Sequence, residues 1–431
     1  MSRELFGTDG VRGLAGEYPL DDDGARKIGM AVGQHFAQSG QRVIMAQDPR
    51  RSSAAIVASL TAGLNAMGVD VVSVGVLPTP GLAYLTRQGD YAAGVMVTAS
   101  HNPVEYNGVK VFDSHGDKLT DETESILNKL IVDGVEPRGS GQALVDDKLT
   151  QAYEDFLVSS AEGLKLTGLR LAVDSANGAA SGLAARVFER LGAEVMPMAD
   201  QPNGLNINDH CGATSPEALT AKVVSDQLDL GVALDGDADR LLLIDSQGRE
   251  VKGDYIMYIL AVAGDLKGVV ATEMSNQGFE QALHARGIDV KRTKVGDRYV
   301  LNGLSETGYK LGGEQSGHII MPALLATGDG LLAAVRTVKA VAGSNRSLAE
   351  WCNDVKLLPQ VIINLPLSDK SRLERPEVET FITKETAKLA DEGRILIRPS
   401  GTEPLARIMV EAPEAQAIAE HLAGELKRLV A

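Results

Sequence analysis

The stretch Thr98-Ala99-Ser100-His101-Asn102-Pro103 follows a short apolar run that spans residues 92–97. The apolar run predicts a buried strand, and the proline predicts that regular structure ends there. Loops that follow buried strands often hold functional residues, although a strand end with turn residues is the simpler interpretation. In the functional interpretation, Ser100 is a nucleophile at the exposed end of a sheet, and His101 orients its hydroxyl or moves a proton.

A second stretch, Asp235-Gly236-Asp237-Ala238-Asp239-Arg240, follows another apolar run over residues 230–234. Three carboxylates at alternate positions on a turn repel one another unless a cation binds, and oxygen-only ligands suit Mg²⁺ or Ca²⁺. An acidic surface turn is the alternative. The stretch lacks the later glycine and glutamate spacing of an EF-hand loop. We therefore expect Asp235, Asp237 and Asp239 to converge on one hard cation.

Composition narrows the class of partner. The 431 residues, 44% hydrophobic and 23% charged, allow two to four globular domains. A net charge of -16 and an aromatic content of 4% disfavour nucleic acid and anionic membranes, so we expect neither as a partner.

The two cysteines, Cys211 and Cys352, are not spaced as in a disulfide framework or a metal site. Because no apolar leader or run of 18 apolar residues occurs, we expect a cytoplasmic protein.

The hydrophobic pattern repeats three times along the chain. Each repeat contains a strand, a helix and a second strand, and then a further helix and one more strand that ends in a polar loop. These loops span residues 98–103, 235–240 and 313–318, and the last one reads Gly-Glu-Gln-Ser-Gly-His. We expect the three loops to occupy one structural position in three α/β domains and to face a shared cleft.

Domain boundaries are predicted where this periodicity lapses in turn-rich segments. The last part of the chain differs, because it reads as helix, strand, loop, strand and helix, an α+β unit. The predicted fold class is α/β, with three tandem mixed-sheet α/β domains plus a C-terminal α+β domain around a central cleft. The four predicted domains span residues 1–150, 151–253, 254–365 and 366–431.

Two arginines, Arg12 and Arg240, stand in segments that suit phosphate binding, whereas the segment of Lys110 gives no such indication by itself. Arg12 lies in a glycine-rich segment, residues 6–13, where backbone can approach a ligand and a guanidinium offers a planar fork; a plain turn is the alternative. Lys110 lies on a strand of period two, in which an exposed lysine is the common case. Arg240 ends the acidic stretch, where it can balance phosphate charge or form a salt bridge with an aspartate.

A further candidate loop, Arg398-Pro399-Ser400-Gly401-Thr402-Glu403-Pro404, precedes a second arginine, Arg407. Hydroxyl, backbone N–H and guanidinium donors together suit an anchored, non-reacting phosphate. A helix-cap turn is the alternative, but it does not account for the two arginines.

These four loops, in this order, resemble those of the α-D-phosphohexomutase superfamily, and within it the bacterial phosphoglucosamine mutases. The resemblance covers the whole chain. It identifies residues 98–103 as a phosphoserine loop, 235–240 as a metal loop, 313–318 as a sugar-binding loop and 398–404 as a phosphate-binding loop.

The resemblance implies a role for each candidate residue. Ser100 would carry the transferred phosphate as phosphoserine, and a phosphate oxygen would join the three aspartates in holding one Mg²⁺. The remaining roles are catalysis by Arg12, His101 and Lys110, substrate binding by Arg240, Glu314, Ser316 and His318, and phosphate binding by Arg398, Ser400, Gly401, Thr402 and Arg407.

The implied reaction converts a small-molecule sugar phosphate, glucosamine 6-phosphate, to glucosamine 1-phosphate and feeds UDP-N-acetylglucosamine and cell-wall precursor synthesis. Glucosamine 1,6-bisphosphate would be the intermediate and activator. Gln315 and the segments 6–13 and 203–214 favour this subfamily. A phosphomannomutase or phosphoglucomutase is the alternative, because these enzymes share the four-loop plan. A metal-dependent phosphatase and a non-catalytic sugar-phosphate sensor are more distant alternatives, and a homodimer is left open.

Overall fold

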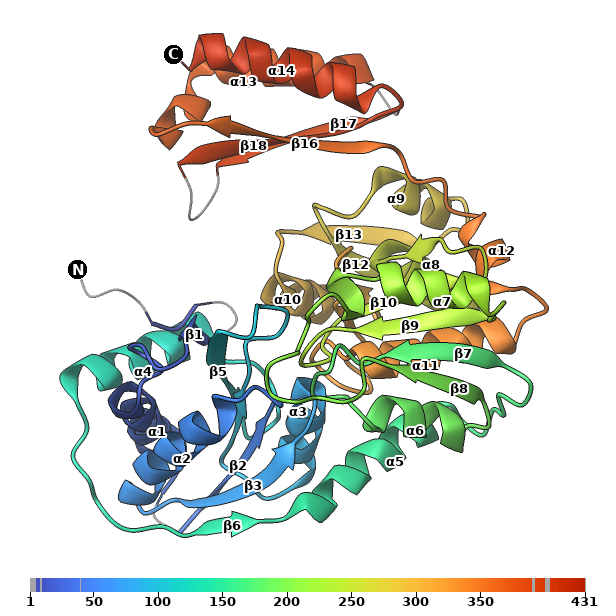
Figure 1. Ribbon diagram of the computed structural model, residues 1–431. Helices are drawn as coiled ribbons and strands as arrows, with labels where there is room; N and C mark the ends of the chain where they lie inside the picture. Colours follow the sequence, from blue (N-terminus) through green and yellow to red (C-terminus); the bar gives the residue numbers. More distant parts are fainter. Residues whose placement is uncertain (1–4, 8–9, 39, 390–391, 400–403, 431) are drawn as a thin grey trace. The chain divides into compact units, whose positions relative to one another are not determined.

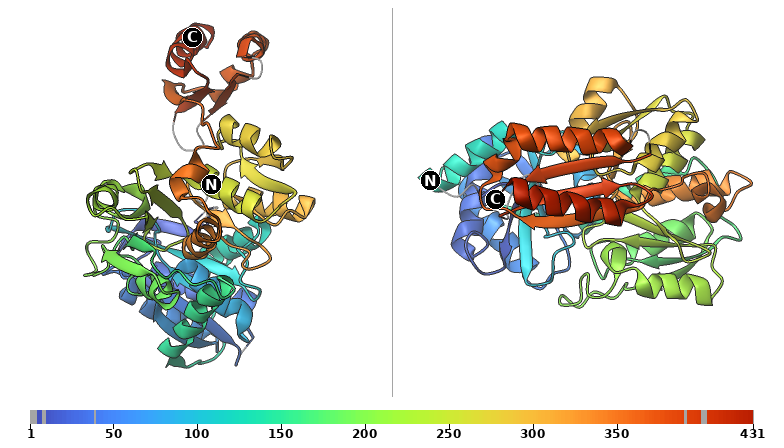
Figure 2. Two further views of the ribbon diagram at one scale, coloured as in Figure 1. Left: turned by 90° about the vertical axis from the view of Figure 1, so that its right-hand side faces the viewer. Right: turned by 90° about the horizontal axis from the view of Figure 1, so that it is seen from above.

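The structure, a computed structural model, describes residues 5–7, 10–38, 40–389, 392–399 and 404–430. Two compact units divide the chain. The larger unit contains Met1–Glu273 and Ile288–Cys352, and the smaller one contains Met274–Gly287 and Asn353–Ala431. Figures 1 and 2 show the elements of each unit. Among the described residues, no helix has the length and apolar character needed to span a membrane.

The first sheet of the larger unit has six strands in the order β1-β5-β4-β2-β3-β6. Its central strands are parallel, whereas β5 runs antiparallel to β4 and β1. Helices α1, α2 and α4 pack on one face and α3 covers the other (Figure 1). The strands are β1 (Val11–Leu14), β2 (Arg42–Gln47), β3 (Asp70–Val76), β4 (Ala93–Val97), β5 (Tyr106–Asp113) and β6 (Ala143–Val145), and the helices are α1 (Asp22–Phe36), α2 (Ser53–Ala66), α3 (Thr79–Gln88) and α4 (Asp121–Asp133).

The second sheet has five strands in the order β11-β10-β9-β7-β8. Strand β7 is parallel to both β8 and β9, and β10 returns antiparallel beside β9. The strands are β7 (Arg170–Asp174), β8 (Glu194–Met198), β9 (Leu230–Leu234), β10 (Leu241–Asp245) and β11 (Glu250–Val251), with α5 (Thr150–Ser160), α6 (Leu183–Arg190) and α7 (Glu217–Ser225).

The third sheet has four strands in the order β13-β12-β14-β15. Strand β12 is parallel to β13 and β14, and the two-residue strands β14 and β15 form a short antiparallel hairpin. The elements are α8 (Gly253–Ala263), β12 (Gly268–Thr272), β13 (Asp289–Thr293), α10 (Asp297–Thr307), β14 (Gly312–Gly313), β15 (Ile319–Ile320), α11 (Gly330–Ala342) and α12 (Leu348–Cys352).

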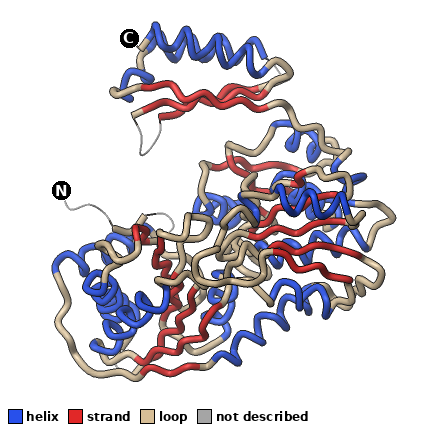
Figure 3. Tube along the Cα trace, in the orientation of Figure 1, coloured by secondary structure: helices blue, strands red, loops and turns tan. Residues whose placement is uncertain are grey.

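The smaller unit contains a three-stranded antiparallel sheet in the order β16-β18-β17, with two long helices on one face (Figure 3). The amphipathic helix α14 and the sheet bury a core of their own that includes Ile408 and Leu422. The elements are α9 (Gln277–His284), β16 (Gln360–Pro366), α13 (Pro376–Leu389), β17 (Arg394–Pro399), β18 (Leu405–Glu411) and α14 (Ala415–Leu429).

The predicted fold class is confirmed: mixed α/β sheets occur in three successive parts of the chain, and an α+β unit follows them. The strands β4 and β9, which precede the two main candidate loops, are buried at every position. The loop at residues 313–318 differs from the other two, because it lies within the β14–β15 hairpin rather than after a long strand. The predicted domain limits and the central cleft stay predictions.

Candidate functional site

The loops that follow β4 and β9 meet in the larger unit. The hydroxyl of Ser100, a residue only 1% exposed, donates a hydrogen bond to Oδ2 of Asp235 at 2.7 Å. Ser100 has a φ of 53°, which places a non-glycine residue in the left-handed region. A serine held in this sparsely populated conformation is typical of a functional loop. The two motifs that the sequence singles out therefore form one site.

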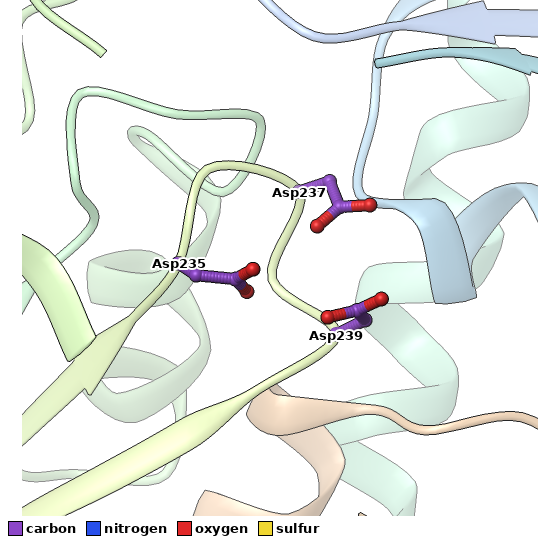
Figure 4. A group of neighbouring side chains, drawn as sticks. All are labelled: Asp235, Asp237 and Asp239. Atoms are coloured by element: carbon purple, nitrogen blue, oxygen red, sulfur yellow. The ribbon is translucent and has the colours of Figure 1, made fainter. Parts of the chain in front are cut away.

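The three aspartates of the metal loop point toward one another (Figure 4). Asp235, Asp237 and Asp239 each offer one carboxylate oxygen, and these oxygens lie within 4.8 Å of one another. All three residues are buried, at 0%, 0% and 4% exposure. Such a cluster of buried carboxylates is costly unless cations or donors compensate its charge.

Each carboxylate of this cluster is held through at least one oxygen. Oδ1 of Asp235 accepts the N–H of Arg240 at 3.1 Å. Oδ2 of Asp237 accepts from the Thr79 hydroxyl at 2.6 Å and from Lys110 Nζ at 2.8 Å, and Oδ2 of Asp239 accepts from Lys110 Nζ at 3.1 Å.

The carboxylate oxygens that accept no hydrogen bond make the cluster suitable for a metal ion. Oδ1 of Asp237 and Oδ1 of Asp239 are buried and accept no hydrogen bond, although His318 Nδ1 and Arg240 Nε lie 3.8 Å and 4.0 Å from Oδ1 of Asp239. Buried carboxylate oxygens without donors are rare in proteins, and a hard divalent cation satisfies them. The donor set, which contains only oxygen atoms, suits Mg²⁺.

Burial and mutual repulsion affect the carboxyl groups of the cluster unequally. Burial, together with the nearby charges of Asp239 and Asp237, raises the pKa of Asp235 well above its usual range. Burial also opposes ionisation of Asp239, but the ammonium of Lys110, His318 and the guanidinium of Arg240 together outweigh it and hold the pKa of Asp239 well below its usual range. These neighbouring cationic groups therefore keep at least one carboxylate of the cluster ionised.

Basic side chains lie beside the loop that contains Ser100 and beside the aspartates. Lys110 is only 3% exposed, unlike the exposed lysine that is common on such a strand. It is buried because β5 directs its side chain toward Asp237 and Asp239. Arg12 lies on β1 opposite Gly108 of β5, and its Nη1 reaches Oδ1 of Asn102 at 3.5 Å. His101 Nδ1 lies 3.3 Å from the Ser100 hydroxyl oxygen. Burial and the charges of Arg240 and Arg12 lower the pKa of His101 to about 4, so its imidazole is neutral near pH 7.

The candidate sugar-binding loop lies against the metal loop. The N–H of Leu241 donates to the carbonyl of Gly317 at 3.0 Å, which joins the hairpin to β10. His318 is buried, and its Nδ1 lies 3.8 Å from Oδ1 of Asp239. Although burial opposes protonation, Asp239 raises the pKa of His318. Burial raises the pKa of Glu314, whereas Ser316 is exposed.

The candidate phosphate-binding residues belong to the smaller unit. Arg398 on β17 and Arg407 on β18 are directly opposite each other in the register, so their side chains share one face of the sheet. Both are half-buried. Ser400, Gly401 and Thr402 lie outside the described residues.

Four residues of this site were not predicted from the sequence: Asp48, Arg50, Thr79 and Asn208. Asp48 and Arg50 follow β2, and Thr79 begins α3. The rule that led to Ser100, a polar residue directly after a buried parallel strand, also marks Asp48. No comparable signal marks Thr79 or Asn208, whose contacts are with residues far away in the sequence.

Comparison with known proteins agrees with this arrangement. Four models of the phosphoglucomutase/phosphomannomutase family match: alpha/beta/alpha domain I over residues 3–136, domain II over 149–248, domain III over 252–357 and the C-terminal domain over 362–428. The phosphoglucosamine mutase of Alcanivorax borkumensis is 44% identical, with 100% of this chain and 99% of that protein covered.

Two solved structures have a similar fold. A phosphoglucomutase/phosphomannomutase family protein from Burkholderia thailandensis is 28% identical, with a TM-score of 0.83 and coverage of 100% and 97% of the two chains. N-acetylphosphoglucosamine mutase from Aspergillus fumigatus, in complex with GlcNAc-6P and magnesium, is 19% identical, with a TM-score of 0.68 and coverage of 99% and 95%. From the four matched domains and the full-length relative, this chain belongs to the phosphoglucomutase/phosphomannomutase family.

Proposed function

We propose that this chain is a phosphoglucosamine mutase that converts glucosamine 6-phosphate to glucosamine 1-phosphate, with Ser100 as the phosphorylated residue. One observation carries the proposal: the Ser100 hydroxyl is held 2.7 Å from a buried carboxylate of a cluster in which two further oxygens lack donors. Phosphoryl transfer needs positioning and charge neutralisation more than covalent activation. A serine beside a site for a divalent cation meets both needs.

Asp235, Asp237 and Asp239 would hold one Mg²⁺ together with an oxygen of the Ser100 phosphate. When bound, Mg²⁺ supplies neutralisation of charge on the transferring phosphoryl group. Thr79 and Lys110 keep one oxygen of Asp237 engaged, so that the other is directed into the cluster. Lys110 and Arg12 add cationic charge beside the same phosphoryl group.

The reaction takes place in two transfers. In the first, the bond between phosphorus and Ser100 Oγ breaks and a bond to the sugar 1-hydroxyl oxygen forms, which gives glucosamine 1,6-bisphosphate. The hydroxyl loses a proton and Ser100 Oγ regains one; the neutral imidazole of His101, 3.3 Å from Oγ, can hand this proton on. After the bisphosphate turns over, its 6-phosphoryl group returns to Ser100 and glucosamine 1-phosphate leaves.

Specific recognition of the sugar is proposed for the hairpin loop. Glu314, Ser316 and His318 would contact the sugar, with Arg240 beside them, and the carboxylate of Glu314 would pair with the ammonium group. The non-reacting phosphate would be held by Arg398, Ser400, Gly401, Thr402 and Arg407. The second candidate function is phosphomannomutase or phosphoglucomutase, because the family models and structural neighbours, among them the Burkholderia thailandensis protein, carry those names.

Intact-mass measurement tests the phosphoserine. Incubation with glucosamine 1,6-bisphosphate and Mg²⁺ should add one phosphate, which peptide mapping should assign to Ser100. The Ser100→Ala variant should bind glucosamine 6-phosphate and lose nearly all turnover, because the neighbouring hydroxyl of Thr98 is engaged with Asp48. Phosphate on another residue, or near-normal turnover of the variant, would refute the proposal.

Kinetics on three substrates test the sugar. A site that pairs an ammonium group penalises a hydroxyl analogue, because its carboxylate then has a weaker partner. The kcat/KM for glucosamine 6-phosphate should exceed those for glucose and mannose 6-phosphate on the order of a hundredfold or more, each assay being primed with its own 1,6-bisphosphate. Equal values would favour the second candidate function.

A further inference from the structure

We propose that Arg50 is a positioning residue that holds the backbone of the phosphoserine loop, and so aims Ser100 Oγ for phosphoryl transfer. The inference rests on the proposed role of Ser100 and goes beyond it. The contacts of the Arg50 side chain are with Asp48 and with backbone carbonyls, not with the proposed substrate-binding residues or the three aspartates. Arg50 is 2% exposed, although it lies in a Pro-Arg-Arg sequence that resembles a surface turn.

The guanidinium of Arg50 donates to four carbonyl oxygens, three in the phosphoserine loop and one at Tyr106, the first residue of β5. Nη2 donates to the carbonyl of Ser100 at 3.0 Å and to that of Asn102 at 2.8 Å. Nη1 donates to the carbonyl of Pro103 at 2.5 Å and to that of Tyr106 at 3.1 Å. Together with the Nε contact to Asp48, these bonds use all five N–H donors of the side chain.

Asp48 extends this arrangement to the other side of Ser100. Its Oδ2 accepts from Arg50 Nε at 2.9 Å and from the Thr98 hydroxyl at 2.8 Å. The Thr98 oxygen in turn accepts the N–H of Ser100 at 2.9 Å. Both backbone polar groups of Ser100 are therefore held, the carbonyl by Arg50 directly and the N–H through Thr98 and Asp48.

This anchoring matters because the backbone of Ser100 adopts an unfavourable conformation. A φ of 53° persists in a serine only where the surroundings fix it. Asn208, in the segment that follows β8, also donates to the Ser100 carbonyl, at 2.9 Å. A Cβ on Gly236 would lie 2.5 Å from that same oxygen, so the metal loop approaches closely only because residue 236 is glycine. The carbonyl of Ser100 is thus fixed between the two loops.

A buried ion pair such as Asp48–Arg50 contributes little to stability compared with apolar residues of the same volume. Its contribution here is geometric, because a planar guanidinium presents five donors in fixed directions and an ammonium presents three on a flexible stem. Lysine at position 50 keeps the charge but leaves some of the four carbonyls without their donor. The loop can then relax, and Ser100 Oγ moves from its position beside Asp235.

The test compares Arg50→Lys with Arg51→Lys, the same substitution at the neighbouring, exposed arginine. In Arg50→Lys, kcat with glucosamine 6-phosphate should fall on the order of a hundredfold, since an error of about 1 Å in placing a reacting group costs that much. KM should change less than about threefold, because the substrate contacts are elsewhere. The rate of phosphate transfer from glucosamine 1,6-bisphosphate to Ser100 should fall in parallel. Arg51→Lys should match the wild type.

A second variant keeps the inference testable if Arg50→Lys does not fold, as judged by circular dichroism and urea unfolding. Thr98→Val keeps the side-chain shape and removes the hydroxyl that joins Asp48 to the Ser100 N–H. It should lower kcat and the transfer rate in the same direction, with KM nearly unchanged. Wild-type transfer rates in a folded Arg50→Lys, an effect on KM alone, or wild-type kcat in Thr98→Val would overturn the inference.

Failure of this inference is distinguishable from failure of the proposed function. If peptide mapping of the wild-type protein finds the phosphate on a residue other than Ser100, the proposed function fails. If the phosphate is on Ser100 and the folded Arg50→Lys variant takes it up at the wild-type rate, only the role of Arg50 fails.

Discussion

At the scale of single residues, Asp237 shows how the two oxygens of one carboxylate serve different purposes. Oδ2 accepts hydrogen bonds from Thr79 and Lys110, whereas Oδ1 has no donor. Thr79 also donates its backbone N–H to the Asp237 carbonyl at 3.0 Å, so both side chain and backbone of the aspartate are held by the start of α3. Loss of a group that orients a metal ligand in this way typically lowers metal affinity or activity about 10- to 100-fold.

Replacement of Thr79 by valine should therefore weaken metal binding. Valine keeps the shape and removes the hydroxyl that donates to Asp237. The Mg²⁺ concentration for half-maximal activity should rise about 10- to 100-fold, with a smaller change in kcat at saturating Mg²⁺. Mg²⁺ titration of the activity measures this.

Thr86 provides the matched control for this prediction. It lies on the same helix, is also fully buried, and its hydroxyl donates to the carbonyl of Leu82 rather than to the metal loop. Thr86→Val should leave the Mg²⁺ dependence unchanged. An identical Mg²⁺ dependence of Thr79→Val and the wild type, or activity that survives exhaustive chelation, would contradict the metal assignment.

At the scale of elements, the start of α11 supports the metal loop. The N–H of Gly330 donates to the carbonyl of Ala238 at 3.0 Å. Asp329 caps the helix by accepting the N–H of Leu332 at 2.8 Å, and its other oxygen accepts the hydroxyl of Tyr153 at 3.0 Å. A helix N-terminus favours a carboxylate, but complete burial opposes its charge.

This burial makes the stability of the protein depend on the ionisation of Asp329. Burial raises the pKa of Asp329 to about 7 from 3.8. The folded state therefore keeps a proton that the unfolded state releases, and the stabilisation, complete below the unfolded pKa, is lost as the pH rises through the folded pKa. Asn at this position is neutral and can still accept the N–H of Leu332, so it removes this pH dependence.

We therefore expect Asp329→Asn to gain stability relative to the wild type as the pH increases from 5 to 8. The gain should be on the order of 2–3 kcal/mol. Urea unfolding of both proteins at several pH values measures the difference between their midpoints. A difference that does not vary with pH would show that Asp329 keeps the same protonation state in the folded and unfolded protein.

At the scale of the whole molecule, the larger unit assembles one site from three sheets. Lys110 of the first sheet contacts Asp237 and Asp239 of the second. His318 of the third sheet lies beside Asp239. Lys118, which follows β5, forms an ion pair with Asp297 at the start of α10. The ligand-binding loops of α/β domains lie at strand ends, and three such ends converge here.

The smaller unit is expected to contribute binding rather than chemistry. Arg407→Ala should raise KM for glucosamine 6-phosphate about 10- to 100-fold, the range for loss of a charge-assisted hydrogen bond. The change in kcat should be smaller, because an anchoring contact acts in the ground and transition states alike. Steady-state kinetics measure both constants.

Arg428→Ala is the control for this substitution, since Arg428 lies on α14 of the same unit and pairs with Glu425 on the surface. It should leave KM unchanged. A loss of kcat in Arg407→Ala with an unchanged KM would contradict the anchoring role.

The sequence by itself determined where the buried strands lie and which polar residues follow them. Apolar runs such as 92–97 and 230–234 are local signals, since a strand buried on both faces requires an apolar side chain at nearly every position. The residues that follow them, Ser100 and the aspartates, were predicted from their types and spacing. These inferences needed no knowledge of contacts between distant residues.

Only the tertiary structure decided which residues touch. Ser100 and Asp235 are 135 positions apart, and their hydrogen bond depends on how two sheets pack. Arg50 and Arg51 are identical in type and adjacent, yet the first is buried among four carbonyls and the second is exposed. The direction of a side chain after a strand end is set by the turn and by the segment that packs over it. That segment, residues 100–106, comes some fifty positions later in the chain.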